Sequence, residues 1–194
     1  MTVTDRISQL IETPRPWLTD GGLETDMVFN HGVDLPSFAS FTMLADATKR
    51  DLLVDHFAQY IAMAAEAGAG FVLDTCTWRA NAPWMARMGY AEADIARINQ
   101  DAVEFCKQIR MKHETPKLPI LINGIIGPAG DGYVVGDTLS TQAAEAAHTP
   151  QIAALAGAGA DMISALTMNY IEEAIGVAIA GGYKSTKKFV EEAN

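Results

Sequence analysis

The run Phe71-Val72-Leu73-Asp74-Thr75, which leads into Cys76-Thr77-Trp78-Arg79-Ala80-Asn81, decides the fold. Its first part is a continuous apolar run, as expected for a parallel strand that is buried on both faces. Its second part is a loop, and helical periodicity follows from Ala91 to about Lys112. A strand that leads through a loop into a long helix is the repeating unit of a parallel α/β sheet.

The same order of elements occurs four times along the chain. Short strand-like runs lie at 17–20, 71–75, 119–123 and 161–166, and a polar or glycine-rich loop follows each of them. Helical patterns then begin near residues 48, 91, 140 and 170. Gly68 and Gly70 are predicted to end the first of these helices, whereas 23–46 is predicted to be irregular. The alternation predicts four βα units with right-handed crossovers.

The number of units sets the expected architecture. A complete eight-unit barrel takes about 250 residues, whereas four units already occupy 17–181 of this 194-residue chain. The remaining 182–194 is a polar C-terminal tail without an apolar run for a fifth strand. We expect a single domain over 1–194 of class α/β, a parallel (βα)₄ half of a TIM barrel.

A four-stranded sheet of this kind cannot close on itself, so its first and last strands would expose unpaired edges. Self-association would cover those edges. We therefore expect a homodimer in which two halves form an eight-stranded barrel. The alternative is a fragment that associates with a missing C-terminal half.

Composition and charge exclude several function classes. Hydrophobic residues make up 49% of the chain and charged residues 20%, which is typical of a globular protein. The net charge of −10 argues against binding to nucleic acid or to anionic lipid. Cys76 and Cys106 lie far apart without metal-ligand spacing, which favours a reducing compartment. With no signal peptide and no uninterrupted apolar span, the sequence predicts a soluble cytoplasmic protein.

Polar residues gather where each predicted strand ends, and ligands of parallel α/β sheets bind at that edge. Along the chain they are Asp20-Gly21-Gly22, then Thr75, Cys76 and Thr77, then Asn123-Gly124, and finally Thr167 and Asn169. Each cluster alone could simply end a strand, and their shared edge is what favours a site. The Asp20 carboxylate could bind a ligand ammonium group or cap the segment that follows it.

Other candidate motifs point to structure rather than chemistry. The glycine-rich stretch 127–132 lacks the lysine and the helix of a phosphate-binding loop. Cys76 has no histidine nearby in the sequence to activate it, and the four histidines lack the spacing of a zinc site. Trp78 and Trp84, with Met85 and Met88, are expected to cover a barrel mouth or the edge of the core.

Four segments, taken in order, resemble the homocysteine S-methyltransferase family. They are Leu18-Thr19-Asp20-Gly21-Gly22-Leu23-Glu24-Thr25, Asp74 to Asn81, Gly124-Ile125-Ile126-Gly127-Pro128, and Ala160-Asp161 with Glu172-Glu173-Ala174. The likeness covers roughly 17–180. It implies a (βα)₈ barrel in which zinc activates the homocysteine thiol as a thiolate.

The resemblance also implies roles for individual residues. The family's Asp-Gly-Gly motif, which helps to hold the amino-acid part of homocysteine, corresponds to Asp20, Gly21 and Gly22. Its Thr-x-Thr element corresponds to Thr75 and Thr77. The family's zinc cysteines lie after the sixth strand and near the end of the barrel, and neither Cys76 nor Cys106 matches them. Leu166, beside Thr167, stands where the family tends to carry a glutamate that binds the substrate amine.

These observations lead to three alternative functions. The first is a homocysteine S-methyltransferase-like half-barrel without zinc-dependent methyl transfer of its own, with no cofactor and no metal ligands. The second is an active methyltransferase for a small amino-acid thiol, with a site assembled across a dimer. The third is a non-catalytic structural or interaction module. The first is preferred, and the substrate-binding candidates are Asp20, Gly21, Gly22, Thr75, Thr77 and Thr167.

Overall fold

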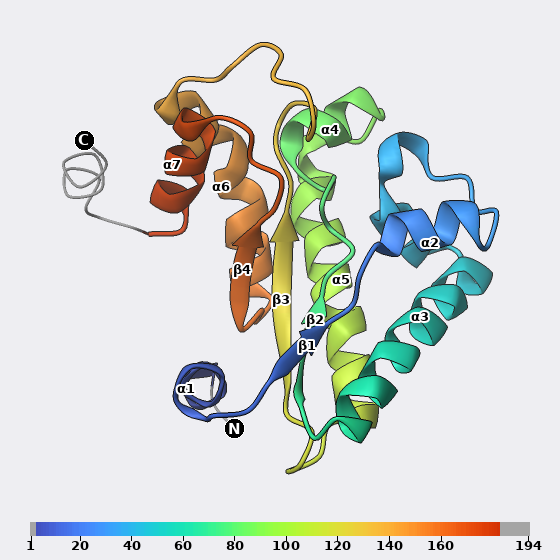
Figure 1. Cartoon of the computed structure of the whole chain (residues 1–194). Helices are drawn as coiled ribbons and strands as arrows, with labels where there is room; N and C mark the ends of the chain where they lie inside the picture. The colour runs from blue at the N-terminus through green and yellow to red at the C-terminus, as the bar shows by residue number, and fades with distance from the viewer. Residues whose placement is uncertain (1–2, 183–194) are drawn as a thin grey trace.

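The computed structural model describes residues 3–182, which form a four-stranded sheet flanked by helices (Figure 1). The strands are β1 (Trp17–Thr19), β2 (Gly70–Asp74), β3 (Ile120–Ile126) and β4 (Met162–Ala165). The helices are α1 (Val3–Glu12), α2 (Leu23–Phe29), α3 (Ala47–Glu66), α4 (Ala82–Arg87), α5 (Glu92–His113), α6 (Thr141–Gly157) and α7 (Ile171–Ala180). Two short 3-10 helices, Pro36–Phe38 and Ser40–Ala45, lie between α2 and α3.

The sheet confirms the expected architecture. Its spatial order is β1-β2-β3-β4, and each neighbouring pair is parallel. Helix α3 connects β1 to β2, α5 connects β2 to β3, and α6 connects β3 to β4. This arrangement is half of a TIM barrel. Figure 1 shows α1 at the end where the strands begin, and α2 and α4 at the opposite end.

The core lies between the sheet and its helices. Phe71 and Leu73 of β2 belong to the same buried cluster as Phe57 of α3 and Phe105 of α5. The register pairs Phe71 with Ile120, which lies in that cluster too. Because side chains alternate between the two faces of a strand, the residues between these point to the opposite, inner face. Asp74 is therefore on the inner face, where its register partner is Asn123.

Of the two glycines predicted to end the first helix, one does so and the other does not. Gly68 has a φ of +66° and follows α3, as predicted for a residue after a helix end. Gly70 is instead the first residue of β2, where a Cβ would lie 2.5 Å from the Trp17 ring. Strand β3 also continues three residues past the predicted end at Asn123, because Gly124, Ile125 and Ile126 pair with β4.

The stretch 23–46 was expected to be irregular and is more ordered than that. Helix α2 begins after Gly22, which has a φ of +63° and makes no side-chain cap. The 3-10 helix Ser40–Ala45 is tied to this region because Ser40 Oγ donates to Glu24 Oε1 at 2.6 Å. The short helix α4, which was not predicted either, is capped by Asn81, whose Oδ1 accepts from Trp84 N at 3.2 Å.

The two edge strands are less buried than the two central ones. All of β3 is buried, whereas every residue of β4 is partly or fully exposed. A groove of about 630 Å³ lies against β4, α6 and α7, and Ile152, Met162, Ile163 and Val177 are among its lining residues. The predicted polar tail, 182–194, lies outside the described residues apart from Gly182. Within 3–182, no helix is long and apolar enough to span a bilayer.

Candidate ligand pocket at the strand ends

One pocket collects residues from the ends of all four strands. It has a volume of about 300 Å³, within the range of small-molecule sites. The segment after β1 contributes Asp20, Gly22, Leu23, Glu24 and Thr25, the 3-10 region contributes Phe38, β2 and its loop contribute Asp74, Thr75 and Trp78, and later segments contribute Ile125, Tyr133, Leu166 and Thr167. The predicted site residues Asp20, Gly22, Thr75 and Thr167 therefore come together. Gly21 and Thr77 do not line the pocket.

Asp20 supplies a nearly buried carboxylate to this pocket. Its side chain is 6% exposed, and Oδ2 lies 3.2 Å from His56 Nε2. The other oxygen, Oδ1, has no hydrogen-bond partner among the described residues. The capping alternative is not what the structure shows, because the residue that caps α2 is Gly22. A buried carboxylate oxygen without a donor leaves one strong acceptor for a ligand.

His56 of α3 forms a hydrogen bond with Asp20 on the side away from the pocket. Its Nδ1 lies 2.8 Å from Asp26 Oδ2, so both ring nitrogens face carboxylates. Burial lowers the pKa of His56, but the hydrogen bonds to Asp20 and Asp26 outweigh it and raise the pKa above the usual 6.5. The imidazolium form is thus favoured, and it donates one proton to each carboxylate. Asp20 is fixed in orientation while its Oδ1 stays free.

Two further carboxyl groups line the same pocket. Burial, followed by the nearby charge of Asp20, raises the pKa of Asp74 to about 7, although Asn123 Nδ2 donates to Asp74 Oδ1 at 2.8 Å. Burial also raises the pKa of Glu24, and the hydrogen bond from Ser40 offsets this only in part. The pocket therefore holds three carboxyl groups, and at neutral pH Asp74 is near the midpoint of its titration.

The threonines of the site form a short chain of hydroxyl groups. Thr77 Oγ1 donates to Ile125 O at 2.6 Å, so the proton between Thr77 and Thr75, at 2.6 Å, comes from Thr75. Thr75 Oγ1 also accepts from Ile125 N at 2.9 Å. Thr77 is fully buried and supports Thr75 from behind. Thr167 has a φ of +59°, donates to Leu166 O at 2.6 Å, and accepts from Trp78 Nε1 at 3.1 Å.

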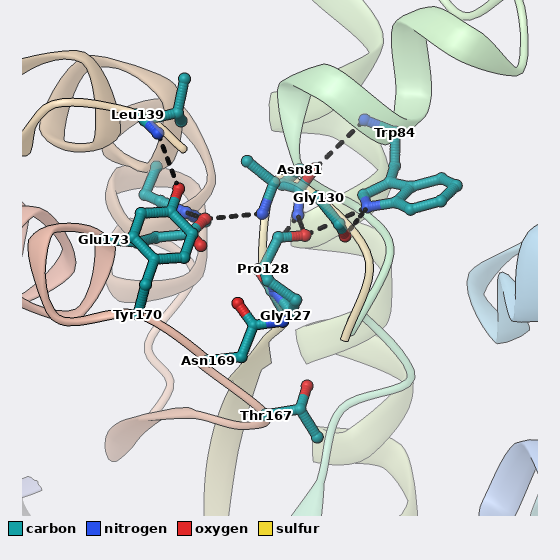
Figure 2. A network of polar contacts seen from close by, with 12 residues as sticks. Asn81, Trp84, Gly127, Pro128, Gly130, Leu139, Thr167, Asn169, Tyr170 and Glu173 are labelled. Carbon is teal, nitrogen blue, oxygen red and sulfur yellow. Dashed lines mark hydrogen bonds and ion pairs between the residues drawn. The ribbon is translucent and has the colours of Figure 1, made fainter. Parts of the chain in front are cut away.

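The loop after β3, which contributes Tyr133 to the pocket, is held in place by hydrogen bonds to its carbonyl groups (Figure 2). Asn81 Nδ2 donates to Gly127 O and Pro128 O, at 3.1 and 3.2 Å, and Trp84 Nε1 donates to Pro128 O at 3.1 Å. A Cβ on Gly127 would lie 2.5 Å from the Trp78 carbonyl oxygen, so only glycine fits there.

The side chain of Arg79 is stacked between two tryptophan rings. The Arg79 guanidinium lies 3.7 Å from the ring centre of Trp78 and 3.9 Å from that of Trp84. Its Nη1 also donates to Gly130 O at 3.1 Å. Arg79 is 5% exposed and stacks between two rings, which stabilises it without a carboxylate contact. Trp78 lines the pocket, whereas Trp84 does not.

The cysteines do not fit the zinc chemistry that the sequence resemblance implies. Zinc binds thiolates, whereas burial raises the pKa of Cys76 to about 12 and raises that of Cys106 well above its usual value. Both are free and buried in the core. Within residues 3–182 no cluster of three or more histidine, cysteine, aspartate or glutamate side chains is arranged to hold a metal ion.

Comparison with known proteins places this geometry in a family. The family model for homocysteine S-methyltransferase matches residues 17–190. The chain belongs to the homocysteine S-methyltransferase family. A comparison with curated protein sequences gives no significant match.

Solved structures of a methyltransferase share the fold. The oxidised form of the homocysteine methyltransferase MmuM from Escherichia coli superposes with a TM-score of 0.74 at 22% identity, over 90% of this chain and 61% of that chain. The metallated form gives a TM-score of 0.70 and the apo form 0.63, both at 22% identity, covering 89% and 90% of this chain and 60% and 58% of theirs. The homocysteine methyltransferase-like chain described here thus spans about three fifths of MmuM, and the likeness concerns the fold.

Sequence reasoning missed three residues of this family member's pocket. His56 lies on the buried face of α3 between Leu53 and Phe57, where a polar residue is a signal in itself. Asp74 is the last residue of the apolar strand β2, where a charged side chain is a comparable signal. Glu24 follows the Asp-Gly-Gly motif directly, but only the fold reveals that it turns back into the pocket.

Proposed function

We propose that this chain is a homocysteine S-methyltransferase-like half-barrel that holds the ammonium group of a small amino-acid-like ligand and carries out no zinc-dependent methyl transfer on its own. The observation that supports binding most directly is the buried Asp20 side chain, whose Oδ1 has no partner among the described residues. An ammonium group would supply the missing donor in a charge-assisted hydrogen bond. Phe38, Ile125 and Leu166 would contact the apolar part of the ligand.

Calorimetric titration with methionine and homocysteine tests the binding proposal. We expect D20N to weaken binding about tenfold or more, because an amide lacks the charge that a hydrogen bond of this kind uses. D55N is the matched control, since Asp55 is exposed on α3 and the substitution removes the same charge. Equal affinity of D20N and the unsubstituted protein would contradict the proposed role of Asp20. If no small amine binds at all, the alternative of a non-catalytic interaction module is favoured.

The proposal that this chain does not use zinc rests on the protonation and burial of its two cysteine thiols. Cys76 and Cys106 are protonated and packed in the core, so metal binding would have to expel protons and open the core. We expect less than stoichiometric zinc after dialysis against a zinc-containing buffer, as measured by elemental analysis. One tightly bound zinc per isolated chain would contradict this part of the proposal. Free cysteines also support a cytoplasmic location.

We further propose that a second copy of the chain completes the barrel. The support is the exposed edge strand β4 and the groove beside it, which is lined largely by apolar residues of β4, α6 and α7. Such an edge pairs readily with another strand. A dimer assembled this way could also complete a catalytic site, which is the alternative in which the assembly is an active methyltransferase.

Light scattering at micromolar concentration tests this assembly. We expect twice the 20.8 kDa of one chain. A165K, on the exposed end of β4, should return the mass to that of a monomer, because lysine on an edge strand blocks pairing. A96K, on the exposed face of α5, is the control and should leave the dimer intact. A monomer without any substitution would contradict the proposed homodimer and favour a different partner for the β4 edge.

A further inference from the structure

The loop between β3 and α6 contains three consecutive apolar side chains that are exposed to solvent. Tyr133 is 84% exposed, Val134 68% and Val135 52%. A run of exposed apolar residues favours aggregation, so it is expected on a surface only where it has a function. We call 133–135 the apolar tip. Tyr133 lines the pocket of Asp20, whereas Val134 and Val135 do not.

Hydrogen bonds to α7 and to the residue before it hold the two ends of this loop. Ala129 N donates to Glu173 Oε1 at 2.7 Å, close to the end of β3. Leu139 N donates to Tyr170 Oη at 3.0 Å, just before α6 (Figure 2). Glu173 is in the first turn of α7, and Tyr170 is its N-cap residue. Both ends of the loop are therefore fixed relative to the same helix.

The apolar tip between these ends is held by a single side chain. Tyr133 N and Val134 N donate to Asp131 Oδ1, at 2.7 and 2.9 Å. Within the described part of the chain, 133–138 makes no other hydrogen bond. A Cβ on Gly136 would meet nothing within 4 Å, and glycine adopts backbone conformations that other residues do not. The apolar tip can therefore move while the ends of the loop stay in place.

The pocket beside the apolar tip has other exposed apolar residues in its lining. Phe38 and Leu166 both line it, and both are exposed. Phe38 has a φ of +58°, and Thr167, which also lines the pocket, has a φ of +59°. This backbone conformation is costly for residues other than glycine and is typical of ligand sites. An apolar surface at the mouth suits a ligand whose ammonium group lies at the nearly buried Asp20 and whose apolar end extends outward.

We propose that the apolar tip closes over the pocket when a ligand is bound, and that Val134 and Val135 then contact the apolar end of the ligand. The inference deepens the proposed function and rests on it, because the ligand is the small amino-acid-like molecule held at Asp20. Closure removes apolar surface of the tip and of the ligand from water, and this burial favours the closed form. Without a ligand there is less apolar surface to cover, so the open form is favoured.

The double substitution V134S/V135S tests this closure by calorimetric titration with methionine. Neither valine lines the open pocket, so a rigid pocket would bind methionine equally well without them. Closure instead predicts about tenfold weaker binding, because apolar surface that the ligand buries against the tip is lost. I171S is the matched control, since Ile171 is an exposed β-branched residue at the start of α7 that does not line the pocket. It should bind methionine like the unsubstituted protein.

Amide hydrogen exchange, measured by mass spectrometry, follows the apolar tip in the unsubstituted protein. We expect peptides that cover 133–138 to exchange about tenfold more slowly when methionine is saturating, because closure shields these amides from water. The loop 114–119 between α5 and β3, at the opposite end of the sheet, should exchange at an unchanged rate. This measurement does not depend on how any variant folds.

The outcomes separate this inference from the proposed function. If methionine binds through Asp20 but neither exchange nor V134S/V135S shows an effect, the proposed function stands and the closure is wrong. If exchange slows but V134S/V135S binds methionine normally, the contacts assigned to the two valines are wrong. Slow exchange of 133–138 before any ligand is added would contradict the open form and show that another chain covers the tip. If neither methionine nor homocysteine binds, the proposed function fails and this inference fails with it.

Discussion

Replacing Glu173 with alanine should lower the free energy of unfolding by about 1–3 kcal/mol for each of the two buried donors that would lose their acceptor. Glu173 Oε1 lies 2.9 Å from His148 Nε2, and both side chains are fully buried. The same oxygen accepts from Ala129 N at 2.7 Å, and so joins α7 to the loop after β3. The substitution would leave the imidazole and this amide without an acceptor.

A urea titration followed by circular dichroism measures this loss, with E172A as the matched control. Glu172 is the exposed neighbour in α7, and its removal should change stability by no more than about 0.5 kcal/mol. Similar stability of E173A and E172A would show that the pair contributes nothing. Burial raises the pKa of Glu173, but the hydrogen bond to His148 and other contacts outweigh this and hold it below the usual 4.5. The stabilisation is therefore present at neutral pH and is lost as the pH falls through the lowered value.

Replacing Gly176 with alanine should also destabilise the protein, by about 1–3 kcal/mol, as is typical of overpacking. A Cβ at this position would lie 2.6 Å from Ala144 Cβ, 2.7 Å from Thr141 O and 2.8 Å from Glu145 N. Two of these atoms are backbone, so α6 and α7 would have to separate. Alanine in a helix otherwise gains up to about 1 kcal/mol over glycine, and the clash reverses that sign.

G157A provides the opposite result on the neighbouring helix. Gly157 is the last residue of α6, and a Cβ there would meet nothing within 4 Å. Its replacement should leave thermal stability unchanged or raise it slightly, since helix propensity is then the main effect. If G176A and G157A shift the unfolding midpoint equally, the close approach of α6 and α7 is not tight in solution.

The fold could be predicted from sequence because a strand that is buried on both faces is a continuous apolar run. The apolar runs around Leu73 and Ile122 identify central strands without any knowledge of their neighbours. The stretch 23–46 has no comparable pattern in its sequence. Helix α2 has seven residues and begins after a left-handed glycine, while Ser37 and Phe38 take positive φ values of 55° and 58°. Contacts distant in sequence, such as that of Ser40 with the Cys76 carbonyl, hold this stretch.

The candidate site was predictable where it follows strand ends and not where it depends on packing. Asp20, Thr75 and Thr167 were expected to share one edge of the sheet, and they line one pocket. His56 was not expected, because it lies 36 residues from the carboxylate that it contacts. The raised pKa of Asp74 depends on its environment, since burial and the nearby Asp20 charge cause it. Charge interactions of this kind follow from distance in space, which residue spacing does not encode.

The strand order β1-β2-β3-β4 has a consequence for how the protein is made. Each new strand pairs with the one synthesised before it, so no strand has to wait for a later segment to insert beside it. The sheet can assemble in the order in which the ribosome releases it, as domains generally fold from the N-terminus during synthesis. At every stage the growing edge is the newest strand. A chain of such units can gain or lose one at its end without rearranging those already paired, which makes the half-barrel a modular structure.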